Sequence, residues 1–363
     1  MSDGIQQWSE IADRFRDGLI LGNGASIAIH AGFHYQSLLD EAQRHEFLDA
    51  DTLAVFKAFG SNQHDFELVL RRLWYARQVN EALKLSGEPV DRVDISYQKV
   101  RRALIETVRV THVTYDKAAP HFDSIARFAR RFRTVLSLNY DLILYWALMY
   151  GNREKLGNFR DCFRYNGSGH LVLDRDWTEY RNGSETTLCF YPHGNLLLAR
   201  TTEGEEVKLQ AGNSKLLDAI LSNWESAEVL PIFVCEGTAE QKQRSISGSS
   251  YLSRVASKAF DEIGESIVIF GWSMGPQEQH IIERIIARRP KALAISVRNG
   301  NEQIVRRANE LFADKVEDLV FFDAQSPGVW ANSDGSRERE ESEVMAEVLE
   351  AIKRINLHRG SDM

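Results

Sequence analysis

Short apolar runs that alternate with amphipathic stretches constrain the fold of this chain most. Each run holds four to six residues and is rich in Val, Ile, Leu or Phe, as expected for strands that helices cover on both faces of a parallel sheet. The expected strands are 18–21, 134–138, 187–191, 230–234, 266–270, 292–297 and 319–322. Their alternation with helical patterns predicts an α/β fold with a Rossmann-like, doubly wound and mostly parallel sheet.

Helical spacing fills most of the intervals between these runs. The expected helices are 142–149, 214–223, 251–263, 277–287 and 302–312. Apolar residues also recur at steps of three and four between 36 and 132, as at Phe66, Leu70 and Trp74. That interval is far longer than a crossover between parallel strands requires, so we predict a large helical insertion there.

The length of 363 residues allows two domains, or one domain with an insertion. We expect residues 1–35 and 133–330 to form one Rossmann-like domain, with a helical lobe at 36–132. We expect a charged linker and a C-terminal helix within 331–363. Two polar segments, 151–183 and 239–250, are expected to be irregular, the second as a flexible loop that closes over a ligand.

Composition argues against several classes of protein. The formal charge of −8 disfavours a broad nucleic-acid surface, and the apolar runs are too short for a membrane helix. The N-terminus lacks the pattern of a secretory signal. Cys162, Cys189 and Cys235 lie far apart, which excludes a zinc ribbon and offers no disulfide framework. We therefore expect a cytoplasmic protein with no metal, no membrane contact and no direct nucleic-acid partner.

Four polar or glycine patches close apolar runs and carry the functional prediction. They are Gly22–Ser26, Asn139–Asp141, His193-Gly194 and Gly271–Ser273. In open α/β sheets, ligands bind at the carboxyl ends of the strands. The patches therefore predict one nucleotide site with a histidine beside it.

The glycine patches are the candidate cofactor-binding elements. Gly22 and Gly24 would let the backbone approach a phosphate, with Asn23 between them and the Ser26 hydroxyl as a further donor. The full Gly-x-Gly-x-x-Gly fingerprint is absent because Ile27 stands at its third glycine. A plain strand–helix turn explains the same residues.

The later patches allow the same two interpretations. Gly271 permits close approach of a ligand, and Ser273 either binds a phosphate or ribose oxygen or caps the following helix. Arg298, after the run 292–297, is placed to meet a phosphate.

The candidate catalytic residues are Asn139, His193 and Asp141. The Asn139 amide can bind a ribose hydroxyl or a water. Histidine is the natural acid–base group near neutral pH, although most histidines are structural. Asp141 either assists electrostatically or caps the helix that begins near Leu142, and both roles are compatible.

Together the four patches resemble the sirtuin superfamily, whose members bind NAD on a Rossmann-like sheet and break the nicotinamide–ribose bond. The family's Gly-Ala-Gly-x-Ser is similar to Gly22–Ser26, with Asn23 in place of the alanine. Its Gln-Asn-Ile-Asp is similar to Leu138–Asp141, without the glutamine. Its His-Gly and Gly-Thr-Ser resemble His193-Gly194 and Gly271–Ser273, the latter with Trp272 in the middle. The resemblance spans discontinuous parts of residues 18–300.

The positions at which the sequence departs from the family's motifs indicate which branch of the family it resembles. The four zinc cysteines of protein deacylases are missing, and the pattern looks more like the bacterial sirtuin-like NAD hydrolases of antiphage defence. That resemblance implies an NAD glycohydrolase that yields nicotinamide and ADP-ribose in abortive infection. It also implies a homo-oligomer, with or without a separate sensor or ATPase protein.

Other functions stay open at this stage. The main alternative is a non-catalytic sensor that binds NAD or ADP-ribose and gates a partner. A nicotinamide dehydrogenase is disfavoured by Ile27, with Asp40 only a loose match to the acidic residue that such enzymes need. A deacylase is disfavoured by the missing cysteines.

Overall fold

The computed structural model describes residues 4–34, 37–58, 66–174, 176–177, 180, 185–212, 215–226, 229–234 and 238–335. The expected C-terminal helix and Cys235 lie outside these residues. Within them, no helix is long and apolar enough to cross a membrane.

An eight-stranded sheet forms the centre of the α/β fold, and every neighbouring pair in it is parallel. Its strands, in spatial order, are β1 (Ile5–Gln6), β13 (Asp318–Asp323), β12 (Ala292–Val297), β11 (Ser266–Phe270), β2 (Gly18–Leu21), β3 (Thr134–Ser137), β7 (Thr186–Phe190) and β4 (Asn158–Arg160). Strands β2, β3 and β7 are buried along their whole length, so the sheet is covered on both faces. This confirms the predicted Rossmann-like, doubly wound fold.

The strand order sets where a ligand can bind. From the central strand β2, the chain builds β3 and β7 on one side, and then β11, β12 and β13 on the other. The six strands therefore follow the order 3-2-1-4-5-6 of doubly wound nucleotide-binding sheets, whose direction reverses between β2 and β11. Residues that follow these two strands lie at that switch point.

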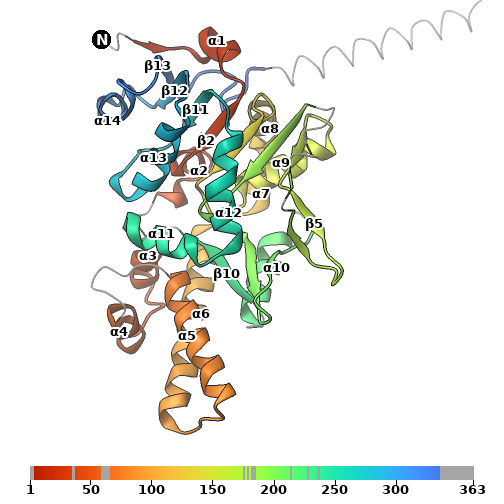
Figure 1. Ribbon diagram of the computed structural model, residues 1–363, viewed down its shortest axis with the longest axis vertical. Coiled ribbons are helices and arrows are strands. Elements are labelled where there is room, and N and C mark those ends of the chain that lie inside the picture. The colour runs from red at the N-terminus through yellow and green to blue at the C-terminus, as the bar shows by residue number, and fades with distance from the viewer. Residues whose placement is uncertain are drawn as a thin grey trace, which may run out of the picture.

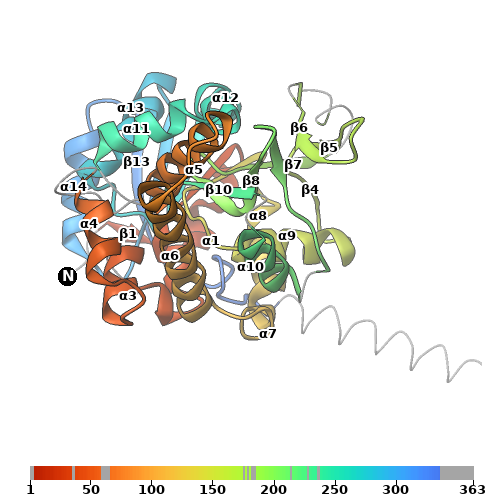
Figure 2. The ribbon, with the colours of Figure 1, turned by 90° about the horizontal axis from the view of Figure 1, so that it is seen from below.

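A run of helices fills the chain between β2 and β3. It comprises α2 (Asn23–Ile27), α3 (Leu38–Arg44), α4 (Ala50–Ala58), α5 (Phe66–Ala82), α6 (Glu88–Thr111), α7 (Tyr115–Ala118) and α8 (Phe122–Ala129). Helices α5 and α6 lie side by side and extend away from the sheet (Figures 1 and 2). Gly87, with a φ of 105°, stands before the first turn of α6, which contains a proline. Helices α3 to α8 lie within the predicted insertion, 36–132, whereas α2 lies before it.

The remaining helices are α1 (Trp8–Ile11), α9 (Ile143–Arg153), α10 (Leu216–Glu225), α11 (Ala239–Ser247), α12 (Ser250–Lys258), α13 (Gln279–Arg288) and α14 (Glu302–Phe312). Strands β2, β11 and β12 and helix α14 coincide with their predicted bounds, and most other predicted elements differ by one to a few residues. Helix α12 continues as a 3₁₀ turn at Ala259–Glu262, and α13 is preceded by one at Pro276–Glu278.

A second, antiparallel sheet was not predicted. Its order is β10 (Val229–Phe233), β8 (Gly194–Thr201), β9 (Glu206–Lys208), β6 (Leu171–Leu173) and β5 (Phe163–Tyr165). The run 230–234 therefore belongs to an antiparallel partner of β8 and not to the parallel sheet, because burial alone does not encode strand direction. The segment 151–183, expected to be irregular, holds the end of α9 and strands β4, β5 and β6.

The prediction of a flexible loop at 239–250 was wrong, because most of this segment is helix α11. The Thr238 hydroxyl accepts from the Gln241 backbone, and the Gln241 side chain accepts from the Thr238 backbone. This capping box starts the helix although its composition is polar. Lys242, Ser245 and Ile246 turn inward from it.

Candidate functional site

A cavity of about 1230 Å³ opens at the carboxyl ends of the central strands. Of the ten residues predicted for the site, it is lined by Gly22, Asn23, Gly24, Asn139, Asp141, His193, Gly271, Ser273 and Arg298. Ser26 lies beneath the surface, 1% exposed. Patches that are far apart in the sequence thus share one site, at the switch point of the sheet.

The two glycine patches pack backbone against backbone. The Gly24 amide donates to the Gly271 carbonyl at 2.6 Å, and the Gly22 amide donates to the Phe270 carbonyl at 3.0 Å. A Cβ on Gly24 would lie 2.7 Å from the Gly271 oxygen. Gly271 has a φ of +67°, and its Cβ would lie 2.4 Å from the Ala25 nitrogen. Close approach of the two loops therefore accounts for these glycines without a ligand.

Asn139 is fixed by two hydrogen bonds from its side-chain nitrogen. Nδ2 donates to the Gly22 carbonyl and to the Ser26 hydroxyl oxygen, both at 2.9 Å. The Ser26 hydroxyl donates its own proton to Asp141, so it can only accept from Asn139. Both amide protons are thereby used within the protein, which leaves the Asn139 side-chain oxygen as the atom for a ligand.

Asp141 is 5% exposed, and protein donors occupy both of its carboxylate oxygens. One accepts from the Ser26 hydroxyl, and the other accepts from the Ile143 amide at 2.9 Å, just inside α9. Its backbone carbonyl accepts from the Asn195 side chain at 2.7 Å. Asp141 therefore positions the loop and the start of the helix, although the N-cap residue itself is Leu142.

His112, on the helical insertion, holds the same loop from behind. Its Nε2 accepts from the Leu142 amide at 3.0 Å, and its Nδ1 contacts the Val113 carbonyl at 2.7 Å. Since Nε2 is the acceptor, Nδ1 carries the proton and the ring is neutral. Burial lowers the pKa of His112 below its usual value, although Asp141 acts in the opposite direction.

His193 is 2% exposed and lies at the junction of the two sheets. Its backbone carbonyl accepts from the Val234 amide at 2.6 Å. Gly194 has a φ of +76°, and its Cβ would meet the Ile232 carbonyl at 2.2 Å. Contact with β10 therefore requires glycine after His193.

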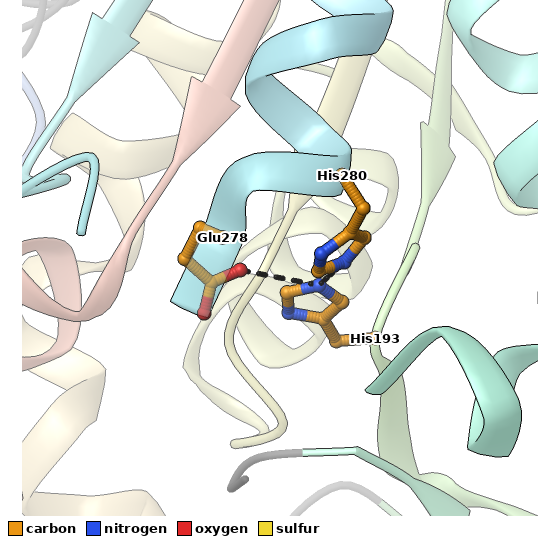
Figure 3. Close-up of side chains that lie close together, drawn as sticks. All are labelled: His193, Glu278 and His280. Atoms are coloured by element: carbon orange, nitrogen blue, oxygen red, sulfur yellow. Dashed lines mark hydrogen bonds and ion pairs between the residues drawn. The ribbon is translucent and has the colours of Figure 1, made fainter. Parts of the chain in front are cut away.

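The His193 ring meets residues that sequence reasoning missed. Its Nε2 lies 2.9 Å from Nε2 of His280 and 3.3 Å from Oε2 of Glu278 (Figure 3). Nζ of Lys242 donates to Oε1 of Glu278 at 2.5 Å. Burial, together with the charge of Lys242, holds the pKa of His193 well below its usual value, although a hydrogen bond to the Leu138 carbonyl acts in the opposite direction. Burial and the neighbouring His193 lower the pKa of His280 to about 4.

The sequence held only weak signals for these three residues. Lys242 lies in α11, which was taken for a loop. Glu278 and His280 stand at the start of a helix that was interpreted only as a crossover, after the Gly271 patch. Their relation to His193 depends on long-range contacts, such as those between α11 and α13, that no local pattern encodes.

The remaining predicted residues, Asn23, Ser273 and Arg298, line the cavity and are less firmly held by the rest of the protein. Nδ2 of Asn23 donates to the Phe33 carbonyl at 3.1 Å. Ser273 and Arg298 are exposed at the rim. Arg298 is thus placed for an anionic ligand, and the expected role of Ser273 as a helix cap is not seen, because Gly275 precedes the Pro276–Glu278 turn.

A comparison with known protein families gives a match that includes every residue predicted for this site. A model described as "Domain of unknown function (DUF4917)" matches residues 19–330. The chain belongs to this family. No curated protein matches it. The match runs from β2 to Trp330, whose indole donates to the Ala25 carbonyl at 2.8 Å at the base of the cavity. The family's description states no activity, so an assignment of function depends on the site.

Proposed function

We propose that this protein cleaves NAD to nicotinamide and ADP-ribose with water. One observation carries the proposal: the four patches that resemble the sirtuin motifs line a single cavity at the switch point of a 3-2-1-4-5-6 sheet. Nucleotides bind at this position in doubly wound sheets. A volume of about 1230 Å³ accommodates a ligand larger than a mononucleotide.

The proposed reaction makes modest demands on the protein. Nicotinamide leaves as a neutral molecule from a cationic ring, so no acid is needed to protonate it. The bond from ribose C1′ to the ring nitrogen breaks, a bond from C1′ to a water oxygen forms, and a proton is released. The site must stabilise positive charge on the ribose and hold the water in place.

Asn139 is the first residue that we assign to this task. Because both of its amide protons are already bound, it presents an acceptor oxygen. Such an oxygen accepts from a ribose hydroxyl or an attacking water, and its dipole favours an oxocarbenium-like state. Ser26 and Asp141 hold the amide in that orientation and act as positioning residues.

His193 is the second residue that we assign to the reaction. It would receive a proton from a ribose hydroxyl or from the attacking water. In the structure its Nε2 faces His280. Proton transfer to this nitrogen therefore requires His280 to give way, which is consistent with an enzyme that is silent until a trigger acts. The lowered pKa keeps the ring neutral near pH 7 with its Nε2 unprotonated, and movement of His280 and entry of water would be needed to raise its basicity.

Chromatography of nicotinamide and ADP-ribose after incubation with NAD tests the proposal. The wild type in its active state is expected to release both products in equal amounts, and Asn139→Ala and His193→Ala to lose at least 100-fold of that rate. Asn309→Ala, on the exposed face of α14, and His170→Ala, which pairs with Glu205 at the surface, serve as matched controls. Equal and measurable rates of NAD cleavage in all five proteins would overturn the assignment of the site.

A binding module is the second candidate, and the enclosed His193 favours it. In that case NAD or ADP-ribose raises the melting temperature, as any ligand selective for the folded state does, without turnover. The two functions separate in one experiment, because only the enzyme converts the NAD that stabilises it. His280→Ala is informative here, since it is expected to release Nε2 of His193 and raise the rate of an inhibited enzyme.

We further propose that the activity serves abortive infection as an antiphage effector, and that assembly controls it. Exposed apolar side chains gather on the α5–α6 hairpin and support it as an assembly surface; they are Tyr75, Val79, Leu83, Leu85 and Ile95. NAD measured in cells with and without phage, for the wild type and His193→Ala, tests the cellular role. Light scattering of the wild type and Leu83→Glu tests whether the hairpin forms a homo-oligomer.

A further inference from the structure

Three buried side chains converge on one point beside the cavity. His193 follows β7, Glu278 ends the 3₁₀ turn before α13, and His280 lies in the first turn of α13. Their potential ligand atoms all lie within 4.8 Å of one another. Figure 3 shows the two imidazoles and the carboxylate turned toward a common centre.

Hydrogen bonds within the protein do not provide partners for all the polar atoms of this cluster. The Leu138 carbonyl accepts from the His193 ring, and since Nε2 is turned toward His280 and Glu278, the donor is Nδ1. A neutral His193 therefore directs a lone pair at both neighbours. A single proton between the two Nε2 atoms would satisfy that pair only. Oε2 of Glu278 and Nδ1 of His280 would still be buried without a hydrogen-bond partner.

We propose that His193, Glu278 and His280 bind a divalent transition-metal ion. Ligand atoms about 2.1 Å from one ion are about 3.0 Å apart at right angles and about 3.4 Å apart in a tetrahedron. The separations from Nε2 of His193, 2.9 Å to His280 and 3.3 Å to Glu278, fall at these two values. Two of the three separations therefore already suit a shared ion, and all three ligand atoms lie within 4.8 Å of one another.

The surroundings supply the outer contacts that metal ligands usually have. The Leu138 carbonyl fixes the tautomer of His193, and Lys242 binds Oε1 of Glu278, which leaves Oε2 for the ion. Lys242 also neutralises the carboxylate, so the cluster as a whole has no net charge with neutral histidines. An ion bound here keeps its double charge and therefore favours an anionic oxygen, from hydroxide or phosphate, as its next ligand.

The donor set selects the ion. Two imidazoles and one carboxylate suit Zn²⁺, Mn²⁺ or Fe²⁺, whereas Mg²⁺ and Ca²⁺ prefer oxygen ligands alone. Zn²⁺ is the tightest binder of these three in such a site. Three protein ligands leave coordination positions open, which is typical of a catalytic and not a structural zinc site. His193 and Glu278 both line the cavity, so a molecule bound there reaches those positions.

This inference goes beyond the proposed NAD cleavage and does not depend on it. The sequence led to the opposite expectation, because the scattered cysteines exclude a zinc ribbon. They say nothing of a site built from histidine and glutamate. If both proposals hold, His193 would be a ligand, and not the proton acceptor, whenever the ion is bound.

Metal binding is measured on the purified full chain without NAD. After treatment with a chelator and dialysis against Zn²⁺, elemental analysis is expected to find about one ion per chain, and Co²⁺ in its place to give a visible spectrum. Glu278→Gln and His280→Gln are expected to weaken Zn²⁺ binding at least tenfold. His170→Ala removes an exposed histidine that also faces a glutamate and is expected to keep wild-type binding.

Two results would overturn the inference. One is a wild-type chain that takes up no Zn²⁺ or Co²⁺ after chelation. The other is Zn²⁺ binding that stays at the wild-type level in Glu278→Gln and His280→Gln. Circular dichroism establishes that each variant is folded, and Glu278→Asp, which keeps the carboxylate, provides a further variant. Because NAD is absent throughout, failure of the metal site and failure of NAD cleavage are separate outcomes.

Discussion

Replacing glycines in the two interlocked loops by alanine tests why glycine stands there. Gly271→Ala adds a methyl group 2.4 Å from the Ala25 nitrogen, at a residue with a φ of +67°. Gly24→Ala adds one 2.7 Å from the Gly271 oxygen, with no positive φ. Gly300→Ala, at a φ of +64° with no atom within 4 Å of the new Cβ, isolates the backbone strain.

The expected losses of unfolding free energy follow from these geometries. Left-handed backbone at a non-glycine residue costs about 1–3 kcal/mol, so Gly300→Ala is expected to lose that amount. Overpacking costs about 1–3 kcal/mol, and in Gly24→Ala a gain of up to about 1 kcal/mol from helix propensity in α2 offsets part of it. Gly271→Ala combines strain and overpacking and is expected to lose about 2–6 kcal/mol.

Urea denaturation followed by circular dichroism measures all three variants against the wild type, with the slope m required to stay constant. The comparison of Gly271→Ala with Gly300→Ala decides the question. Gly271→Ala must lose more unfolding free energy than Gly300→Ala, by at least the cost of overpacking. If the two lose the same amount, the loops do not press on each other as described. In that case the glycines would have to be explained by contact with a ligand.

Three further outcomes follow from buried polar contacts. The pKa of His112 is lower in the folded than in the unfolded chain, so the unfolded chain takes up a proton first as the pH falls. The free energy of unfolding is therefore expected to decrease below about pH 6.5. His112→Gln is expected to reduce this dependence of stability on pH, measured as urea midpoints from pH 5 to 8. Glu206→Ala leaves the buried guanidinium of Arg200 without its carboxylate, 2.6 Å away, and is expected to cost about 3 kcal/mol in chemical unfolding, with a smaller loss in Glu206→Gln. Trp330→Phe removes the hydrogen bond to the Ala25 carbonyl and is expected to cost about 1 kcal/mol in the same assay, unless water enters and replaces the donor.

The parts of the fold that could be predicted are those with a local signal. Strands β11 and β12 are apolar except for Ser266 and Ser296, and Gly271 and Arg298 follow them, so their bounds could be predicted from the sequence. The run that became β10 carries the same signal, yet it pairs antiparallel with β8. Strand direction and sheet membership depend on long-range pairing, which a run of apolar residues does not encode.

The candidate site likewise contains residues that could be predicted from the sequence and residues that could not. Asn139, His193 and Gly271 could be placed together because each follows a strand, and the ends of parallel strands meet at one edge. Lys242 and His280 could not, since they reach the site from helices. The role of Ser26 also changed: predicted as a donor to a ligand, it lies beneath Asn139 and fixes the amide.

The position of β2 between β3 and β11 has a consequence for how the protein folds in the cell. Gly18 pairs with Thr134 on one side and with Ile267 on the other. At about 5–20 residues per second, a ribosome makes Ile267 roughly 10–50 s after Gly18. During that time one edge of β2 has no partner strand, and the two glycine loops cannot meet. A nascent chain is therefore expected to lack the cavity until α12 and β11 have emerged, which makes the unfinished sheet a natural client for chaperones.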